Sequence, residues 1–169
     1  MPDGTCEVCG EYACDCGRCT GCDRVFRARS LNDDGECRAC RPQRIIVTGG
    51  RDFDRRDIVF GVLGNAHRRH GIGLVIQGGA PGADRLARQW ADFYRVPRET
   101  YKAEWRKYGN AAGPIRNERM ATESKADQVH AFRGGAGTND MVSRAIRHGI
   151  VVVDWQLDEA PVCYEDDER

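Results

Sequence analysis

The stretch Phe132-Arg-Gly-Gly-Ala-Gly-Thr-Asn-Asp140 follows an apolar segment and leads into a segment with helical spacing. Its glycines let the backbone approach a neighbouring group closely and adopt positive φ where needed. If a helix begins near Thr138, its free N–H groups and the positive end of its dipole face the loop. The stretch therefore predicts either a tight strand-to-helix turn capped by Thr or Asn, or a loop that binds a phosphate or another anion.

An alternation of apolar segments and helical patterns extends outward from this loop. Short apolar runs typical of buried strands occupy residues 44–48, 74–76, 99–103, 127–132 and 150–153. Helical spacing predicts helices at residues 54–70, 83–94, 114–124 and 138–147. Residues 104–113 are typical of a polar loop. Alternating strands and helices predict an α/β fold with a parallel sheet of about five strands and helices on both faces.

Three of the predicted strands end in glycine-rich turns, at Gly49-Gly50, Gly78-Gly79 and Gly134-Gly135. In a parallel sheet these turns lie at one edge, where ligands of such folds bind. The helix start at Gly113-Pro114 is expected nearby. No Gly-Lys-Ser/Thr follows any of the turns and none fits G-x-G-x-x-G, which disfavours a conventional NTPase or dehydrogenase.

Two arginines and two aromatic residues are candidates for contact with a phosphate-type ligand. Arg51 follows the first glycine turn and Arg116 lies in the first turn after Pro114, where each guanidinium can form paired hydrogen bonds with phosphate oxygens. Trp105 and Tyr108 in the loop before Gly113 either stack on a base or pack the loop down.

Three further polar residues have both a ligand-binding and a structural interpretation. Asp84, in the first turn of a helix, either holds a ribose hydroxyl or caps that helix. Asn117 contacts a base, a ribose or a neighbouring loop. Asp52 orients Arg51 or serves as an acid.

Charge and cysteine content divide the chain of 169 residues into three parts. Residues 1–43 carry a net charge of −2, residues 44–153 a net charge of +8, and residues 154–169 a net charge of −6. The basic middle part is therefore the expected anion-binding domain, and the last part is an acidic tail. With no apolar run of membrane-spanning length and no signal-peptide pattern, the sequence predicts a cytoplasmic protein.

Eight of the nine cysteines lie between residues 6 and 40, a density that indicates metal binding in a cytoplasmic chain. Two C-x-x-C pairs, at 19–22 and 37–40, have the spacing of a four-thiolate Zn²⁺ site. The predicted ligands of this site are Cys19, Cys22, Cys37 and Cys40. A second Zn²⁺ site is predicted at Cys6, Cys9, Cys14 and Cys16. Three alternatives remain for the first four cysteines: they share ligands with the other pairs, they lie in a disordered segment, or two of them form a redox-active pair. The module as a whole resembles a zinc ribbon.

Four motifs resemble the SLOG superfamily, and most closely its YspA/cpYpsA-like branch, which is common in phage and bacterial genomes. They occur in order, at fitting spacing, within residues 44–153. The motifs are Val47-Thr-Gly-Gly-Arg-Asp-Phe53, Gly78-Gly-Ala-x-Gly-Ala-Asp84, Ala112-Gly-Pro-x-Arg-Asn-x-x-Met120 and Gly134-Gly-x-Gly-Thr138.

The resemblance implies a Rossmann-like domain that binds nucleotides or nucleotide derivatives. LOG-type relatives hydrolyse the N-glycosidic bond of nucleoside 5′-monophosphates, DprA-type relatives bind single-stranded DNA, and others are thought to sense nucleotide signals in conflict between phages and hosts. It also implies a homodimer, since related folds often dimerise. The residues implied to contact the ligand are Gly49, Gly50, Gly78, Gly79, Gly82, Gly134, Gly135, Gly137 and Thr138.

One departure from the LOG pattern bears on catalysis. LOG enzymes carry P-G-G-x-G-T-x-x-E, in which the Glu assists cleavage, whereas this chain has Arg133 at the Pro position and Met141 at the Glu position. Asp140 is adjacent, but one helical step turns a side chain by about 100°. If the protein is an N-glycosidase, Asp140 or Glu118 is the candidate acid–base group.

Three functions therefore follow from the sequence. The favoured one is a binding module that captures a nucleotide-type molecule as a sensor or by sequestration. The second is a nucleotide N-glycosidase. The third is a nucleic-acid-binding protein that uses the basic middle part and the zinc module.

Overall fold

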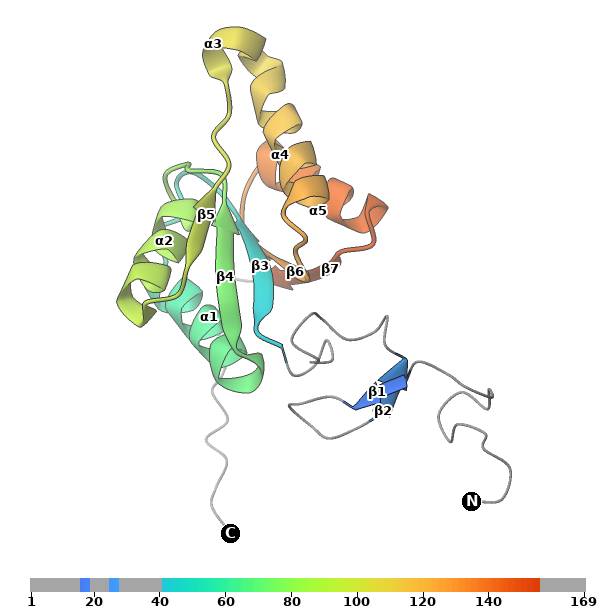
Figure 1. Cartoon of the computed structure of the whole chain (residues 1–169). Helices are drawn as coiled ribbons and strands as arrows, with labels where there is room; N and C mark the ends of the chain where they lie inside the picture. Colours follow the sequence, from blue (N-terminus) through green and yellow to red (C-terminus); the bar gives the residue numbers. More distant parts are fainter. Residues whose placement is uncertain (1–15, 19–24, 28–40, 156–169) are drawn as a thin grey trace, which may run out of the picture. The chain divides into compact units, whose positions relative to one another are not determined.

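The computed structural model describes residues 16–18, 25–27 and 41–155 (Figure 1). The chain forms two compact units, Met1–Pro42 and Gln43–Arg169. In the first unit, strands β1 (Cys16–Arg18) and β2 (Val25–Arg27) pair antiparallel. The cysteine side chains of the predicted zinc sites and the acidic tail from residue 156 lie outside the described residues, so the zinc module stays a prediction.

The second unit contains one parallel sheet of five strands. These are β3 (Gln43–Thr48), β4 (Ile72–Gln77), β5 (Arg98–Thr100), β6 (Gln128–Phe132) and β7 (Val151–Trp155). Their order in the sheet is β5-β4-β3-β6-β7, and every neighbouring pair is parallel. The predicted α/β class and strand number are confirmed. The order reverses at β3 and β6, which makes their carboxyl ends the topological switch point of the sheet.

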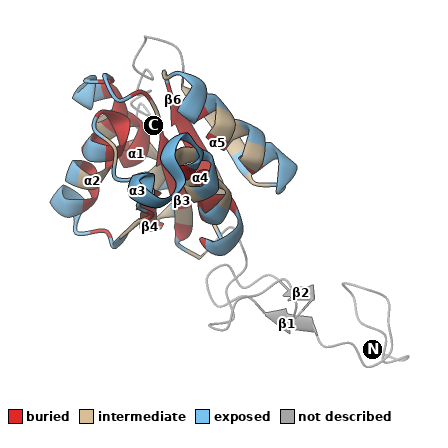
Figure 2. Ribbon diagram, turned by 90° about the horizontal axis from the view of Figure 1, so that it is seen from above, coloured by how far each residue is buried: buried red, intermediate tan, exposed pale blue. Residues whose placement is uncertain are grey.

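Helices cover both faces of the sheet, as predicted (Figure 1). Helices α1 (Arg56–His70) and α2 (Ala83–Tyr94) pack on one face, and α4 (Ala112–Glu123) and α5 (Ala136–Arg147) pack on the other. Alternating residues of β3 supply both cores: Ile45 and Val47 face α1 and α2, and Ile46 faces α4 and α5. Figure 2 shows the buried sheet residues between these helices. None of the helices in the described residues combines the length and the apolar character needed to cross a membrane.

Several element boundaries differ from the sequence-based expectation, and β5 ends at Thr100, three residues before the expected end. Residues 104–113 are not only a loop, because they contain helix α3 (Trp105–Tyr108) and the 3-10 turn η2 (Gly109–Ala111), which lead into α4. Helix α5 begins two residues early, at Ala136. Strand β7 continues past residue 153 to Trp155, whose indole N–H donates to Nδ1 of His130 at 3.0 Å.

Gly61 lies within α1, and an added Cβ there would meet no atom within 4 Å. We predict that Gly61→Ala raises the free energy of unfolding by about 1 kcal/mol, because glycine loses more backbone entropy than alanine in a helix. Urea denaturation measures the effect, and the dependence of the free energy of unfolding on urea concentration should be the same in both proteins. A loss of stability would show that Gly61 is needed for packing outside the described residues.

His130 is a buried histidine with a depressed pKa. It is 2% exposed, and burial lowers its pKa from 6.5 to about 4. Because the Trp155 indole can only donate, Nδ1 of His130 is the acceptor and the ring proton is on Nε2. In the described part of the chain, Nε2 has no hydrogen-bond partner. Folding therefore favours the neutral ring.

We predict that this ring makes stability fall on acidification. Between pH 6.5 and pH 4 His130 is protonated in the unfolded chain but neutral in the folded chain. The free energy of unfolding therefore falls by up to about 3 kcal/mol as the pH is lowered through this window. Urea denaturation from pH 7 to pH 5 would compare the wild type with His130→Phe. The stability of the variant should fall less steeply, whereas parallel curves would contradict the assignment.

Candidate functional site

A cavity of about 570 Å³ opens at the carboxyl ends of β3, β4 and β6. Most of the residues predicted to contact a ligand line it. These are Gly49, Gly50, Arg51, Gly78, Asp84, Gly113, Arg116, Asn117, Gly135, Gly137, Thr138 and Asp140. Four other predicted site residues are not in its lining, namely Gly79, Gly82, Gly134 and Glu118. The structure therefore brings most of the predicted site residues together around one cavity and separates them from predicted residues that do not line it.

The peptide groups of Gly50 join three of the loops around the cavity. Its N–H donates to the carbonyl of Arg133 at 2.9 Å, and its carbonyl accepts the N–H of Ala83 at 3.3 Å. A Cβ at Gly82, whose φ is 74°, would collide with the Gly50 carbonyl oxygen, and one at Gly134 would come within 2.6 Å of the Gly50 nitrogen. Gly82 and Gly134 are thus required for packing between loops.

The N-terminus of α5 is open toward the cavity. The carbonyl of Gly135 accepts the N–H groups of Thr138 and Asn139, at 3.0 and 3.1 Å. Within the described residues, the amides of Ala136 and Gly137 have no acceptor, and no side chain caps the helix. A Cβ at Gly135 or Gly137 would meet nothing within 4 Å. This end of α5 therefore offers free donors and empty space, as an anion site requires.

The turn after β4 is held by Asp84. Its Oδ2 accepts the N–H groups of Gly78 at 2.9 Å and Ala80 at 3.2 Å, and the side chain is buried. Burial raises the pKa of Asp84, and the hydrogen bonds from the backbone partly oppose the rise. The structure thus favours the structural interpretation of Asp84, since its oxygen is committed to its own loop.

Two guanidinium groups face the cavity from opposite sides. Arg116 lies over Gly78, at the place a Cβ of residue 78 would occupy, and its Nε donates to Oδ1 of Asn117 at 2.9 Å. Arg51 stacks on the ring of Trp105 at 5.6 Å. Burial lowers the pKa of Arg116, and the charge of Arg51 lowers it further while Asp84 raises it. No described residue accepts a hydrogen bond from Nη1 or Nη2 of Arg116, so these donors are available to an anion.

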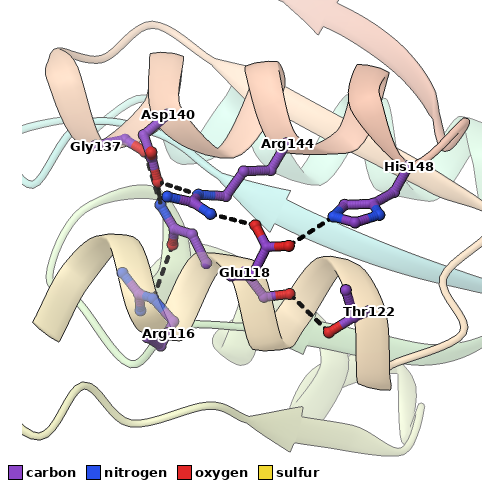
Figure 3. A network of polar contacts seen from close by, with 8 residues as sticks. Arg116, Glu118, Thr122, Gly137, Asp140, Arg144 and His148 are labelled. Atoms are coloured by element: carbon purple, nitrogen blue, oxygen red, sulfur yellow. Dashed lines mark hydrogen bonds and ion pairs between the residues drawn. The ribbon is translucent and has the colours of Figure 1, made fainter.

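A network of side chains fixes α4 against α5 beside the cavity (Figure 3). Nδ2 of Asn117 donates to the carbonyl of Gly137 at 3.1 Å and to Oδ2 of Asp140 at 2.8 Å. Asp140 also accepts from Nε of Arg144 at 2.9 Å. Asn117 is buried, so it connects the Arg116 guanidinium to the start of α5 and sets their relative position.

The two candidate acid–base residues lie in different environments. Asp140 lines the cavity, and although burial raises its pKa, the hydrogen bonds from Arg144 and Asn117 outweigh that effect and lower it. Glu118 faces away from the cavity, where it contacts Arg144 and lies 2.7 Å from Nε2 of His148 (Figure 3). Met141 is fully buried in the core beneath α5. Of the three carboxyl groups in the cavity lining, Asp84 is committed to its loop, Asp140 is held ionised, and Asp52 is exposed.

Several lining residues were not predicted from the sequence. They are Val47, Thr48, Ala80, Asn110, Pro114, Met120 and Ala136. Asp52 and Trp105, which had two interpretations each, also line the cavity. Helical spacing of Gly113, Asn117 and Met120 could have indicated that this face of α4 borders a ligand site.

Comparison with known proteins identifies relatives of this chain. The model of the YspA, cpYpsA-related SLOG family matches residues 43–108. The Gene 61 protein of Mycobacterium phage D29 is 34% identical over 121 residues, which cover 67% of this chain and 96% of the phage protein. This chain belongs to the YspA, cpYpsA-related SLOG family. No solved structure matches it significantly. The family match covers the first two glycine turns of this SLOG domain, and the α5 loop lies beyond it.

We predict that Asp84→Ala destabilises this SLOG domain by about 1 to 3 kcal/mol, because the amides of Gly78 and Ala80 lose their acceptor. Asp84→Asn keeps an acceptor oxygen and should cost much less. Thermal or urea denaturation of the two variants measures the difference. Equal losses would show that the charge of Asp84, and not its hydrogen bonds, stabilises the loop.

Proposed function

We propose that this protein binds a nucleotide or nucleotide-derived small molecule in the cavity at the switch point, as a sensor or sequestering module. The observation that carries the proposal is that the open N-terminus of α5 and Arg116, whose Nη donors have no acceptor among the described residues, line the same cavity. Membership of a SLOG family supports a nucleotide-related ligand.

The charges of the lining support a phosphate between Arg116 and α5. Two guanidiniums at one cavity repel each other, and a bound anion removes that repulsion. Of the lining carboxylates, Asp84 and Asp140 already accept hydrogen bonds from protein donors, and Asp52 is exposed to water. The unused donors of Arg116 and α5 suit a phosphate.

The remainder of the lining suits the nucleoside part. Val47 and Met120 supply apolar surface, and Trp105 carries a half-exposed indole at the rim. A cavity of 570 Å³ lies within the range that small-molecule sites occupy. An indole can stack on any base, so this rim favours a ligand with an aromatic ring.

Binding without turnover is favoured over hydrolysis. N-glycosidic cleavage needs a carboxyl group placed to assist the leaving base, whereas the residue at the LOG Glu position, Met141, lies in the core. Asp140 and Asp52 are the carboxyl groups left for the hydrolase alternative, since both line the cavity. Release of free base or ribose 5-phosphate from nucleoside monophosphates by the purified protein would favour that alternative.

Two other parts of the proposal rest on the sequence and the relative. Zn²⁺ bound by the N-terminal cysteines would fold the first unit, which then contacts a partner or a second copy of the chain. The phage relative supports a phage-encoded origin, and the role in phage–host conflict rests on the family resemblance alone. Nucleic-acid binding is the less favoured alternative and would weaken steeply with salt.

Gly135 provides the test of the cavity. Because a side chain at this position meets no other atom, we predict that Gly135→Leu folds normally and blocks the cavity. Mass spectrometry of small molecules released from the denatured wild type should find a nucleotide, and the variant should retain less than about a tenth of it.

The matched control is Gly61→Leu, which adds the same side chain to an open position on α1. It should keep the ligand. Full retention of the ligand by a folded Gly135→Leu variant would place the site elsewhere.

A further inference from the structure

A second cavity, of about 350 Å³, lies on the other side of α4. Apart from Arg116, none of its lining residues lines the first cavity. Its lining consists of Lys102, Glu104, Tyr108, Ala112, Ile115, Arg116 and Arg119. Helical spacing separates the two cavities: Gly113, Asn117 and Met120 face the first, and Ala112, Ile115 and Arg119 face the second. Among the described residues, Arg116 is the one that lines both cavities.

The second cavity is basic. Lys102 is exposed and has no ion-pair partner among the described residues. Arg119 pairs with Glu123 at 3.1 Å and lies over the ring of Tyr101. The single carboxylate of the lining, Glu104, lies 3.9 Å from the ammonium of Lys107. The unbalanced charge at this cavity is therefore positive.

The same cavity carries apolar surface next to the charge. Tyr108 is 39% exposed and Ile115 is 38% exposed, and both are among the exposed large apolar residues of the domain. A flat ring and an aliphatic side chain beside two cations suit a base or a sugar linked to phosphate. A purely inorganic anion would leave that surface in water.

We propose that the second cavity is the subsite for the second nucleoside unit of a dinucleotide, whose linking phosphate lies at Arg116. The inference rests on the proposed function, because the first unit occupies the larger cavity. Arg116 is suited to the linking phosphate since its two Nη donors are unused and its side chain borders both cavities. Lys102 and Tyr108 then contact only the second unit, since neither lines the first cavity.

Isothermal titration calorimetry on the full chain tests this assignment. The probes are AMP, GMP, CMP and UMP, the 5′-phosphorylated dinucleotides pApA, pGpG, pCpC and pUpU, and diadenosine pyrophosphate for the alternative linkage. The wild type should bind its preferred dinucleotide at least about tenfold more tightly than the matching mononucleotide. Lys102→Glu combined with Tyr108→Ala should remove that advantage and leave mononucleotide binding unchanged.

The control is Arg69→Glu, which makes the same change in charge as Lys102→Glu at the exposed end of α1 and should alter neither affinity. Equal affinities of the wild type for both ligand types, or equal losses for both in the double variant, would overturn the second subsite while keeping the first. Binding of neither ligand type by the wild type would overturn the proposed function itself.

Discussion

Two of the hydrogen bonds made by the Gly50 peptide groups join the loops of the site. The N–H of Gly50 binds the loop after β6 through Arg133, and its carbonyl binds the first amide of α2 at Ala83. This arrangement distinguishes the starts of two helices. The first amide of α2, at Ala83, donates to Gly50, whereas the first two amides of α5, at Ala136 and Gly137, have no acceptor in the described chain. The turn after β3 thus joins the other two glycine turns and leaves the first amides of α5 free.

The sequence predicted the sheet because β-branched runs such as Ile45–Thr48 suit only buried strands, and the glycines after them mark a common edge. It could not distinguish the glycines by role. Gly82 allows close packing of two loops, whereas Gly135 leaves open space in the cavity. The sequence shows a glycine in both cases. Helix α3 was missed because four polar and aromatic residues carry no helical period. Pairing between distant residues, as at Asn117 and Asp140, is set by the fold and not by local pattern.

The polar network between α4 and α5 explains why the site favours binding. Asn117 gives its amide hydrogens to Gly137 and Asp140 and its oxygen to Arg116, so every group of that side chain is used. Arg144 bonds both Asp140 and Glu118. A carboxylate in such a network is held ionised and in one orientation, which suits the positioning of a guanidinium. A general acid needs the opposite conditions, namely a raised pKa and freedom to give up its proton.

The stacking of Arg51 on Trp105 adds a condition on the ligand. While Arg51 covers the indole, the guanidinium is partly satisfied by the ring and the ring is partly hidden from water. Inorganic phosphate can attract the guanidinium but leaves the indole uncovered. An apolar ring can cover the indole but offers nothing to the two arginines, whose mutual repulsion remains. A ligand that joins a phosphate to an aromatic ring satisfies both groups at once. The proposed ligand, a nucleotide, combines this charge and this ring within one molecule.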